Sequence, residues 1–149
     1  MRAVVQRVTR AKVTVGQRVI GEIGRGMLVL LGVSVNDNDA DADYLVEKVI
    51  NLRIFDDAFG KMNESLIEVS GEMLVVSQFT LYGDTRRGRR PSFIKAAGGD
   101  KANGLYEYFV VKARTQISKV ATGEFGAMMD VELVNDGPVT IILDSEKSI

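Results

Sequence analysis

The stretch GMLVLLGV, residues 26–33, is a short apolar run that contains no charged residue. A run of this length between turn residues is typical of a fully buried β-strand. An acidic segment follows at residues 36–43, and apolar residues then recur at helical spacing: Ala42, Leu45, Val46, Val49 and Ile50. We therefore predict an amphipathic helix over residues 39–52, with its acidic first turn at the positive end of the helix dipole.

Further strands are predicted on both sides of this unit. Residues 2–8 and 12–20 are two β-rich runs about Gly16, which indicates a hairpin. After the helix, residues 54–70 look irregular, with short strand fragments at 54–55 and 66–67, and a strand follows at 72–80. Two closing strands, 129–134 and 139–143, are joined by a turn at 135–138.

A second amphipathic helix is marked by four apolar residues and begins near Asp100, a plausible cap: Leu105, Phe109, Ala113 and Ile117. The total of about seven strands and two main helices predicts an α+β fold with a largely antiparallel sheet or barrel-like core. The 149 residues contain no internal repeat or linker, so we expect a single domain over 1–149, with 144–149 as a tail.

The composition excludes several kinds of chemistry. The chain has no histidine and no cysteine, which removes the usual general base, the thiol nucleophile and nearly every transition-metal site. We expect no metal and no cofactor. The net charge of −1 argues against a broad nucleic-acid footprint, so DNA is not an expected partner. No apolar run approaches a membrane span, and the absence of cysteine suits a cytoplasmic location.

The most informative stretch is VVSQFTLYGD, residues 75–84, because a buried strand becomes polar on both faces. Ser77, Gln78 and Thr80 supply three hydrogen-bonding side chains about Phe79. Either these groups are tied to nearby backbone, or the strand end binds a ligand. A hydroxyl nucleophile would need a base, so binding together with an oxyanion hole from backbone N–H groups near Phe79 and Thr80 is the simpler catalytic hypothesis.

The aspartates at 37, 39 and 41 resemble the start of a calcium-binding loop. The pattern fails, because Ala42 stands where the loop needs glycine and Lys48 where it needs glutamate. We interpret them as residues of the helix entry.

The loop DTRRGRRPSF, residues 84–93, places Arg86, Arg87, Arg89 and Arg90 around Gly88. Arginine forks suit phosphate oxygens, so the loop either grips a small anion such as an RNA terminus or is a solvated loop. The segment NDGPVT, residues 135–140, has turn chemistry, and base rates predict a trans bond before its proline.

Taken together and in this order, MRAVVQRV, GMLVLLGV, VVSQFTL, RRGRRPSF and NDGPVTI closely resemble the D-aminoacyl-tRNA deacylase family over residues 1–143. The resemblance implies hydrolysis of the ester that joins a D-amino acid, or glycine mischarged on alanine tRNA, to the 3′-terminal adenosine. It also implies assistance from the terminal 2′-OH and rejection of L-aminoacyl groups.

Residue roles also follow from the resemblance. Ser77, Gln78, Phe79 and Thr80 would line the pocket for the aminoacyl group and the terminal adenosine. Gly137 and Pro138 would form a cis peptide that enters the active site of the other subunit of a homodimer, and Arg7 would help to fix that element across the interface. Two alternatives stay open: a non-catalytic RNA-end or nucleotide-binding module, and a conventional hydrolase with Thr80 as nucleophile.

Overall fold

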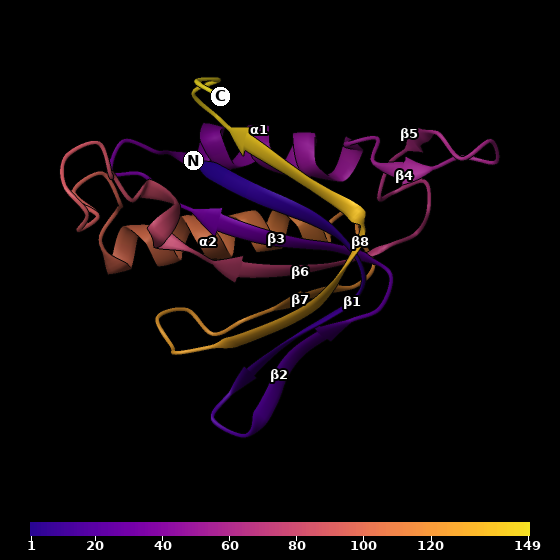
Figure 1. Cartoon of the computed structure of the whole chain (residues 1–149), viewed down its shortest axis with the longest axis horizontal. Coiled ribbons are helices and arrows are strands. Elements are labelled where there is room, and N and C mark those ends of the chain that lie inside the picture. The colour runs from indigo at the N-terminus through magenta and orange to yellow at the C-terminus, as the bar shows by residue number, and fades with distance from the viewer.

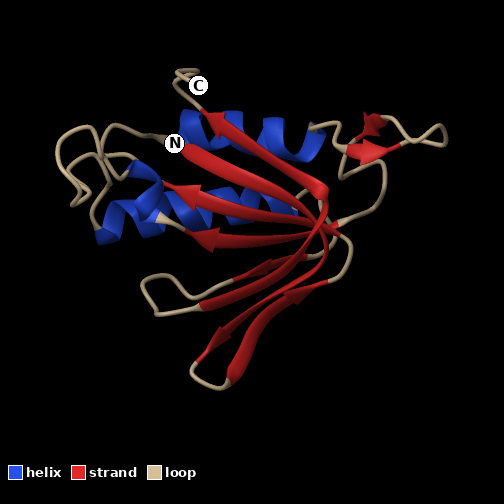
Figure 2. Ribbon diagram, in the orientation of Figure 1, coloured by secondary structure: helices blue, strands red, loops and turns tan.

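A six-stranded sheet forms the centre of the molecule, and its strands run in the order β2-β1-β3-β6-β7, with β8 also paired to β1 (Figures 1 and 2). The computed structural model describes all 149 residues. The sheet comprises β1 (Arg2–Val15), β2 (Arg18–Ile23), β3 (Gly26–Gly32), β6 (Glu72–Ser77), β7 (Val120–Thr122) and β8 (Asp130–Asp144). The remaining elements are α1 (Asp39–Asn51), α2 (Gly99–Arg114), the 3₁₀ turn η1 (Phe79–Tyr82) and a hairpin of β4 (Phe55–Asp56) and β5 (Met62–Glu64).

The predicted α+β class and the largely antiparallel sheet are confirmed. β1 pairs antiparallel with β2, β3 and β8, whereas β3–β6 and β6–β7 are parallel. The parallel pairs arise where a helix connects successive strands, because two neighbouring strands can run in the same direction only if the chain crosses back between them. Here α1 lies between β3 and β6 in sequence, and α2 lies between β6 and β7.

The sheet curls into a nearly closed barrel. The first half of β1 pairs with β3 and its second half with β2, so β2 turns away toward β7. The two edges meet at Gly21, where a Cβ would lie 2.3 Å from the carbonyl oxygen of Thr122. A small apolar cluster fills the interior of the curl: Val8, Ala11, Val13, Ile23, Leu28, Leu74 and Val76.

The larger core lies on the other face of the sheet, between the strands and the two helices. Met27, Val29 and Leu31 of β3 belong to this core, while Leu28 belongs to the cluster inside the curl. Successive side chains of a strand point to opposite faces, so β3 is buried on both sides. This confirms the prediction from the apolar run at residues 26–33 and explains why that run lacks polar alternation.

The first helix begins at its predicted start, Asp39, and ends one residue before its predicted end. Asn38 is the N-cap: its side chain accepts from the backbone N–H of Ala40, and Asp41 completes a capping box. Asp37 has a different role. It is buried, and its carboxylate lies 2.6 Å from the Met1 ammonium and also accepts from the N–H of Ser34 at 2.6 Å.

Several predicted boundaries are wrong. The helix near Asp100 is capped by Gly98, and Ile117 is buried beyond its end. Residues 66–67 lie in a turn, and the partner of β4 is β5 instead. The strand predicted over 72–80 ends at Ser77, and the two closing strands are one element, β8, whose pairing with β1 shifts register near Arg7. No helix has the length and hydropathy needed to cross a membrane.

Candidate active site

The polar end of β6 bends out of the sheet instead of continuing as a strand. The N–H of Gln78 donates to the Leu31 carbonyl at 2.8 Å, and η1 then begins at Phe79. The strand alternation expected for residues 78–80 is therefore lost. The Gln78 amide instead donates to the Thr80 hydroxyl, so the two polar side chains meet next to the turn.

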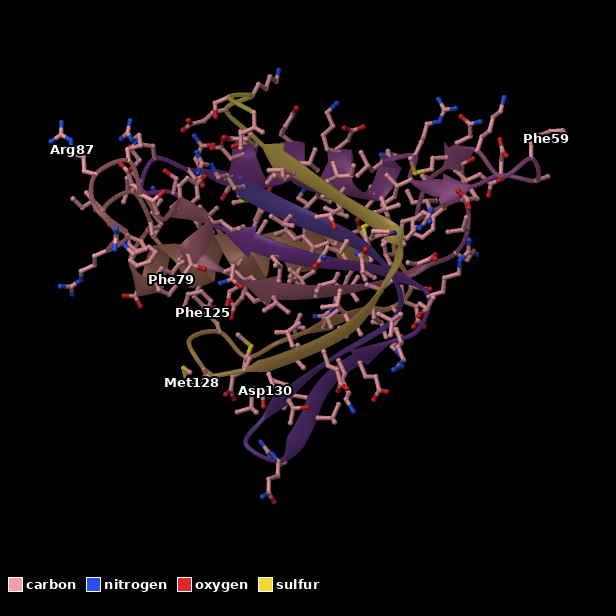
Figure 3. All side chains as sticks on the ribbon, in the orientation of Figure 1. Phe59, Phe79, Arg87, Phe125, Met128 and Asp130 are labelled. Carbon is pink, nitrogen blue, oxygen red and sulfur yellow. The ribbon has the colours of Figure 1, made fainter.

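A cavity of about 490 Å³ opens beside this bend. Ser77 and Gln78 form its polar side, Phe79 lies beside them, and most of the other lining residues are apolar. Helix α2 supplies Ala102 and Tyr106 to the wall, and the segment before β8 supplies Phe125 and Met128. Figure 3 shows Phe79, Phe125 and Met128 on the same side of the molecule. Three of the four predicted residues thus meet in one pocket, while Thr80 reaches it only through Gln78.

The pocket contains almost no acid–base chemistry. Tyr106 is its single titratable lining residue. The Tyr106 hydroxyl donates to the Val75 carbonyl at 2.8 Å, and burial raises its pKa to about 12, so the phenol stays neutral at physiological pH. A side-chain general base is therefore absent from the lining.

Backbone donors are available instead. Within the chain, the N–H groups of Phe79 and Thr80 donate to no acceptor, because they are the first two of η1. Two adjacent free N–H groups beside an apolar pocket are suited to a developing oxyanion. The oxyanion-hole hypothesis from the sequence stays a prediction, and the geometry is compatible with it.

The wall residues were not anticipated from the sequence. Tyr106 and Phe125 pack against each other with ring centroids 5.9 Å apart, although they come from distant parts of the chain. Tyr106 had no signal beyond the apolar face of a helix. The GEFGAMM segment at 123–129 did carry one, because an aromatic residue stands between two glycines and two methionines follow just before a strand.

The arginine loop adjoins the pocket through an aromatic contact. The ring of Phe79 is 56% exposed and meets Phe93 edge-on at 5.1 Å. At the base of the loop, Asp84 and Ser92 exchange backbone hydrogen bonds of 2.8 and 2.9 Å. Arg86 is engaged by Asp84 at 2.7 and 2.9 Å, and these hydrogen bonds hold the pKa of the Asp84 carboxyl far below its usual range.

The other three arginines of that loop are exposed and make no ion pair: Arg87, Arg89 and Arg90. Arg87 extends from the outer end of the loop in Figure 3. The sequence treated the four arginines alike, but in the structure Asp84 neutralises Arg86 and the other three are free cations.

Gly137 and Pro138 lie in a bulge of β8, joined by a cis peptide bond. The base-rate expectation of a trans bond is wrong, and the resemblance gave the right isomer. Gln6 of β1 pairs with Thr140 and Val8 pairs with Asn135, so residues 136–139 project between them. The Asn135 side chain closes the bulge, since its amide donates to the Val139 carbonyl and its oxygen accepts from the Val139 N–H, both at 3.1 Å.

Arg7 lies beneath this bulge, and its side chain is only 9% exposed. Its guanidinium donates to the Asp136 carbonyl at 3.2 Å and to the Ile54 carbonyl at 2.7 Å. It also pairs with the carboxylates of Asp136 at 3.2 Å and Asp56 at 3.4 Å. Arg7 therefore fixes the Gly137–Pro138 element within its own chain.

The bulge and the pocket lie at opposite ends of β3. Arg7 pairs with Met27 near the start of β3, whereas Leu31 pairs with Ser77 at the pocket. Four residues of strand separate them by about 13 Å. Figure 1 shows the bend of β8 and the end of β6 on opposite sides of the molecule, and no bulge residue lines the pocket.

Known proteins resemble this chain over almost its whole length. Residues 4–144 match the family model described as D-Tyr-tRNA(Tyr) deacylase. Curated relatives named D-aminoacyl-tRNA deacylase include those from Clostridium kluyveri, 59% identical, and Thermosipho melanesiensis, 62% identical, each alignment covering 99% of both chains.

Solved structures show the same fold. One described as the c-Myc DNA unwinding element binding protein has a TM-score of 0.92 at 45% identity, covering 97% of this chain and 98% of its own. Another, of a probable eukaryotic D-amino acid tRNA deacylase, has a TM-score of 0.85 at 19% identity, covering 95% and 97% of the two chains.

Proposed function

The chain belongs to the D-Tyr-tRNA(Tyr) deacylase family, and on that premise we propose that it hydrolyses the ester bond of D-aminoacyl-tRNA. The products are free tRNA and the free amino acid. The observation that carries this proposal is the polar end of β6, which opens into an apolar cavity beside two unpaired backbone N–H groups. A cavity of about 490 Å³ is the size of a small-ligand site.

The chemistry proceeds without a side-chain base. The ester carbonyl oxygen lies against the N–H groups of Phe79 and Thr80, which stabilise the negative charge that develops on it. The attacking oxygen belongs to water that the terminal 2′-OH orients, or to the 2′-OH itself, with water then completing hydrolysis. The bond from the carbonyl carbon to the ribose 3′-oxygen breaks, and that oxygen takes the proton released by the nucleophile. Such an ester is already activated, so positioning supplies much of the acceleration.

Ser77 and Gln78 bind the aminoacyl group in this account, and Thr80 acts through its hydrogen bond with Gln78. A nucleophilic Thr80 is disfavoured because the pocket offers no base to activate it. The exposed ring of Phe79 suits stacking on the terminal adenine, and Arg87, Arg89 and Arg90 suit the nearby phosphates. Arg86 contributes less, because Asp84 already neutralises it.

Chiral selection comes from a second copy of the chain. The Gly137–Pro138 bulge is about 13 Å along β3 from its own pocket, so a homodimer is the arrangement in which it lines a pocket. Val134 and Ile142, at 39% and 54% exposure, give β8 an apolar surface on both sides of the bulge for such contact. Carbonyl groups held rigidly in this bulge would clash with an L side chain on the Cα of the aminoacyl group but leave room for a hydrogen. Glycyl-tRNA is therefore also a substrate in this proposal. A cytoplasmic location is part of this proposal, because tRNA is the proposed substrate.

Deacylation assays with purified protein test the reaction. D-aminoacyl-tRNA should release its amino acid, and a substrate whose terminal 2′-OH is replaced by hydrogen should react far more slowly. Binding of tRNA without any release would favour the non-catalytic RNA-end module. Normal cleavage of the deoxy substrate would contradict the proposed role of the 2′-OH.

Mixed dimers test the shared site. Gly99→Trp should block the pocket without strain in the fold, because a Cβ at Gly99 meets nothing within 4 Å. Gly137→Ala should damage the bulge. Each variant alone should be impaired, and mixed dimers should recover one working site if the bulge acts in trans. No recovery, with mixed dimers demonstrably formed, would contradict the shared site.

A further inference from the structure

The 3₁₀ turn η1 carries the two free N–H groups of the candidate active site, yet few side-chain hydrogen bonds hold it. Phe79 and Thr80, its first two residues, are exposed. Arg2 is the only residue of another element whose side chain hydrogen-bonds to η1, donating from a guanidinium nitrogen to the Leu81 carbonyl at 3.1 Å. The same guanidinium stands over the Tyr82 ring, 4.7 Å from its centroid.

Arg2 is itself held by a buried carboxylate. Its Nε lies 3.4 Å from Asp144, whose side chain is only 1% exposed. Asp144 also accepts from the Ser148 hydroxyl at 2.6 Å and from the Glu146 N–H at 2.9 Å. Burial tends to raise the pKa of Asp144, but these hydrogen bonds and that from Arg2 outweigh it and lower the pKa. The carboxylate therefore stays ionised and keeps the guanidinium in place.

The turn also packs on the residue beside Arg2 in the sheet, because Arg2 of β1 pairs with Gly32 of β3. At Gly32, the last residue of β3, a Cβ would lie 3.0 Å from the Gln78 carbonyl oxygen and 3.1 Å from the Leu81 Cβ. The turn thus packs closely on the end of β3, and Arg2 on the neighbouring strand hydrogen-bonds to its backbone. Figure 1 shows both chain termini at this end of the sheet, near the turn that follows β6.

We propose that Arg2 is a positioning residue for the reaction. Its hydrogen bond to Leu81 sets the orientation of η1, so that the N–H groups of Phe79 and Thr80 point at the ester oxygen. This inference rests on the proposed deacylase function. Arg2 touches no substrate; it acts through the backbone of the turn.

Three variants test this role. Arg2→Ala removes both the hydrogen bond and the contact with Tyr82, whereas Arg2→Lys keeps a cation that can donate to the same carbonyl. Lys12→Ala is the matched control, because Lys12 lies on the same strand and pairs with Glu132 at 3.3 Å, and neither residue lines the pocket. Misplacement by about 1 Å can cost about 10²-fold in rate. We therefore expect Arg2→Ala to lower kcat by roughly 10-fold or more, with KM changed less than about 2-fold.

Lysine should restore part of kcat, and the control should retain the wild-type value. Amide hydrogen exchange of residues 79–83 gives a second readout at conditions where every variant is folded. Arg2→Ala should speed exchange in this segment and leave β1 and β3 protected. If Arg2→Ala does not fold, Arg2→Gln, which keeps the length without the charge, replaces it.

Unchanged kcat in folded Arg2→Ala, or slower turnover without any change in exchange at 79–83, would overturn the proposal. Uniformly faster exchange over the whole chain would assign Arg2 a purely structural role and would also overturn it. If the wild-type protein releases no amino acid, the deacylase function fails, and the exchange comparison still decides whether Arg2 orders η1.

Discussion

Replacing Arg7 by alanine is expected to destabilise the protein and loosen its chiral selection together. The guanidinium donates hydrogen bonds to two backbone carbonyl oxygens, that of Ile54 at 2.7 Å and that of Asp136 at 3.2 Å. Hydrogen bonds from charged groups contribute about 1.5–3 kcal/mol each. The ion pairs with Asp56 and Asp136 add little, because those carboxylates are 51% and 43% exposed. We expect a loss of about 3–4 kcal/mol in the free energy of unfolding.

For a chain of this size each kcal/mol shifts Tm by about 2–4 °C, so Arg7→Ala should melt about 10 °C lower. Urea unfolding measures the loss, with Lys12→Ala as control, because its exposed ion pair should cost less than about 1 kcal/mol. The ratio of D to L deacylation, measured below the melting transition, should fall because the bulge loses its anchor. An Arg7→Ala protein as stable as Lys12→Ala, with an unchanged ratio, would refute this reasoning.

The other predictions concern the bulge, the termini, acid stability and the reaction. Gly137→Ala should lower stability and the D-over-L ratio, because Gly137 has φ +126° and its new Cβ would lie 2.8 Å from a valine methyl; wild-type selectivity would contradict this. Asp37→Asn should lower the free energy of unfolding, measured in urea, by about 3–5 kcal/mol, because it leaves the buried N-terminal ammonium without its carboxylate partner. A loss below about 1 kcal/mol would contradict this expectation. Because folding lowers the pKa of Asp144, its carboxylate stabilises the folded protein at pH values above the ordinary carboxyl pKa. This stabilisation is lost as the pH falls through the lowered pKa. Asp144→Asn should therefore remove part of the acid sensitivity, and an unchanged stability–pH curve would argue against it. Thr80→Ala should keep substantial activity, whereas abolished turnover would support a threonine nucleophile.

The elements most readily predicted from the sequence were those with strong local patterns. The apolar run at 26–33 was identified because β3 is buried on both faces, and the helical spacing after Asn38 located α1. The strand at 72–80 was extended too far because alternation cannot detect where a chain leaves its sheet. That point is set by the hydrogen bond from Gln78 to Leu31 and by the close approach of Gly32, both long-range features.

Some residues of the candidate site were also predictable from the local sequence, and others were not. Ser77, Gln78 and Phe79 were identifiable because polar side chains at the end of an apolar strand are unusual. Tyr106 was missed because its local pattern indicates only the apolar face of a helix, and its contact with Phe125 joins that helix to a distant loop. The bulge in β8 looked like a hairpin turn, since only the structure shows that the Asn135 side chain replaces the missing backbone pairing.

The proposed function is that this pocket releases D-aminoacyl groups and rejects their mirror images. The most direct measurement is the initial rate of amino-acid release by the purified wild-type protein from one tRNA charged with the D or the L form of the same amino acid. We expect rapid release of the D form and retention of the L form. Equal rates for the two substrates, or no release of the D form, would contradict it.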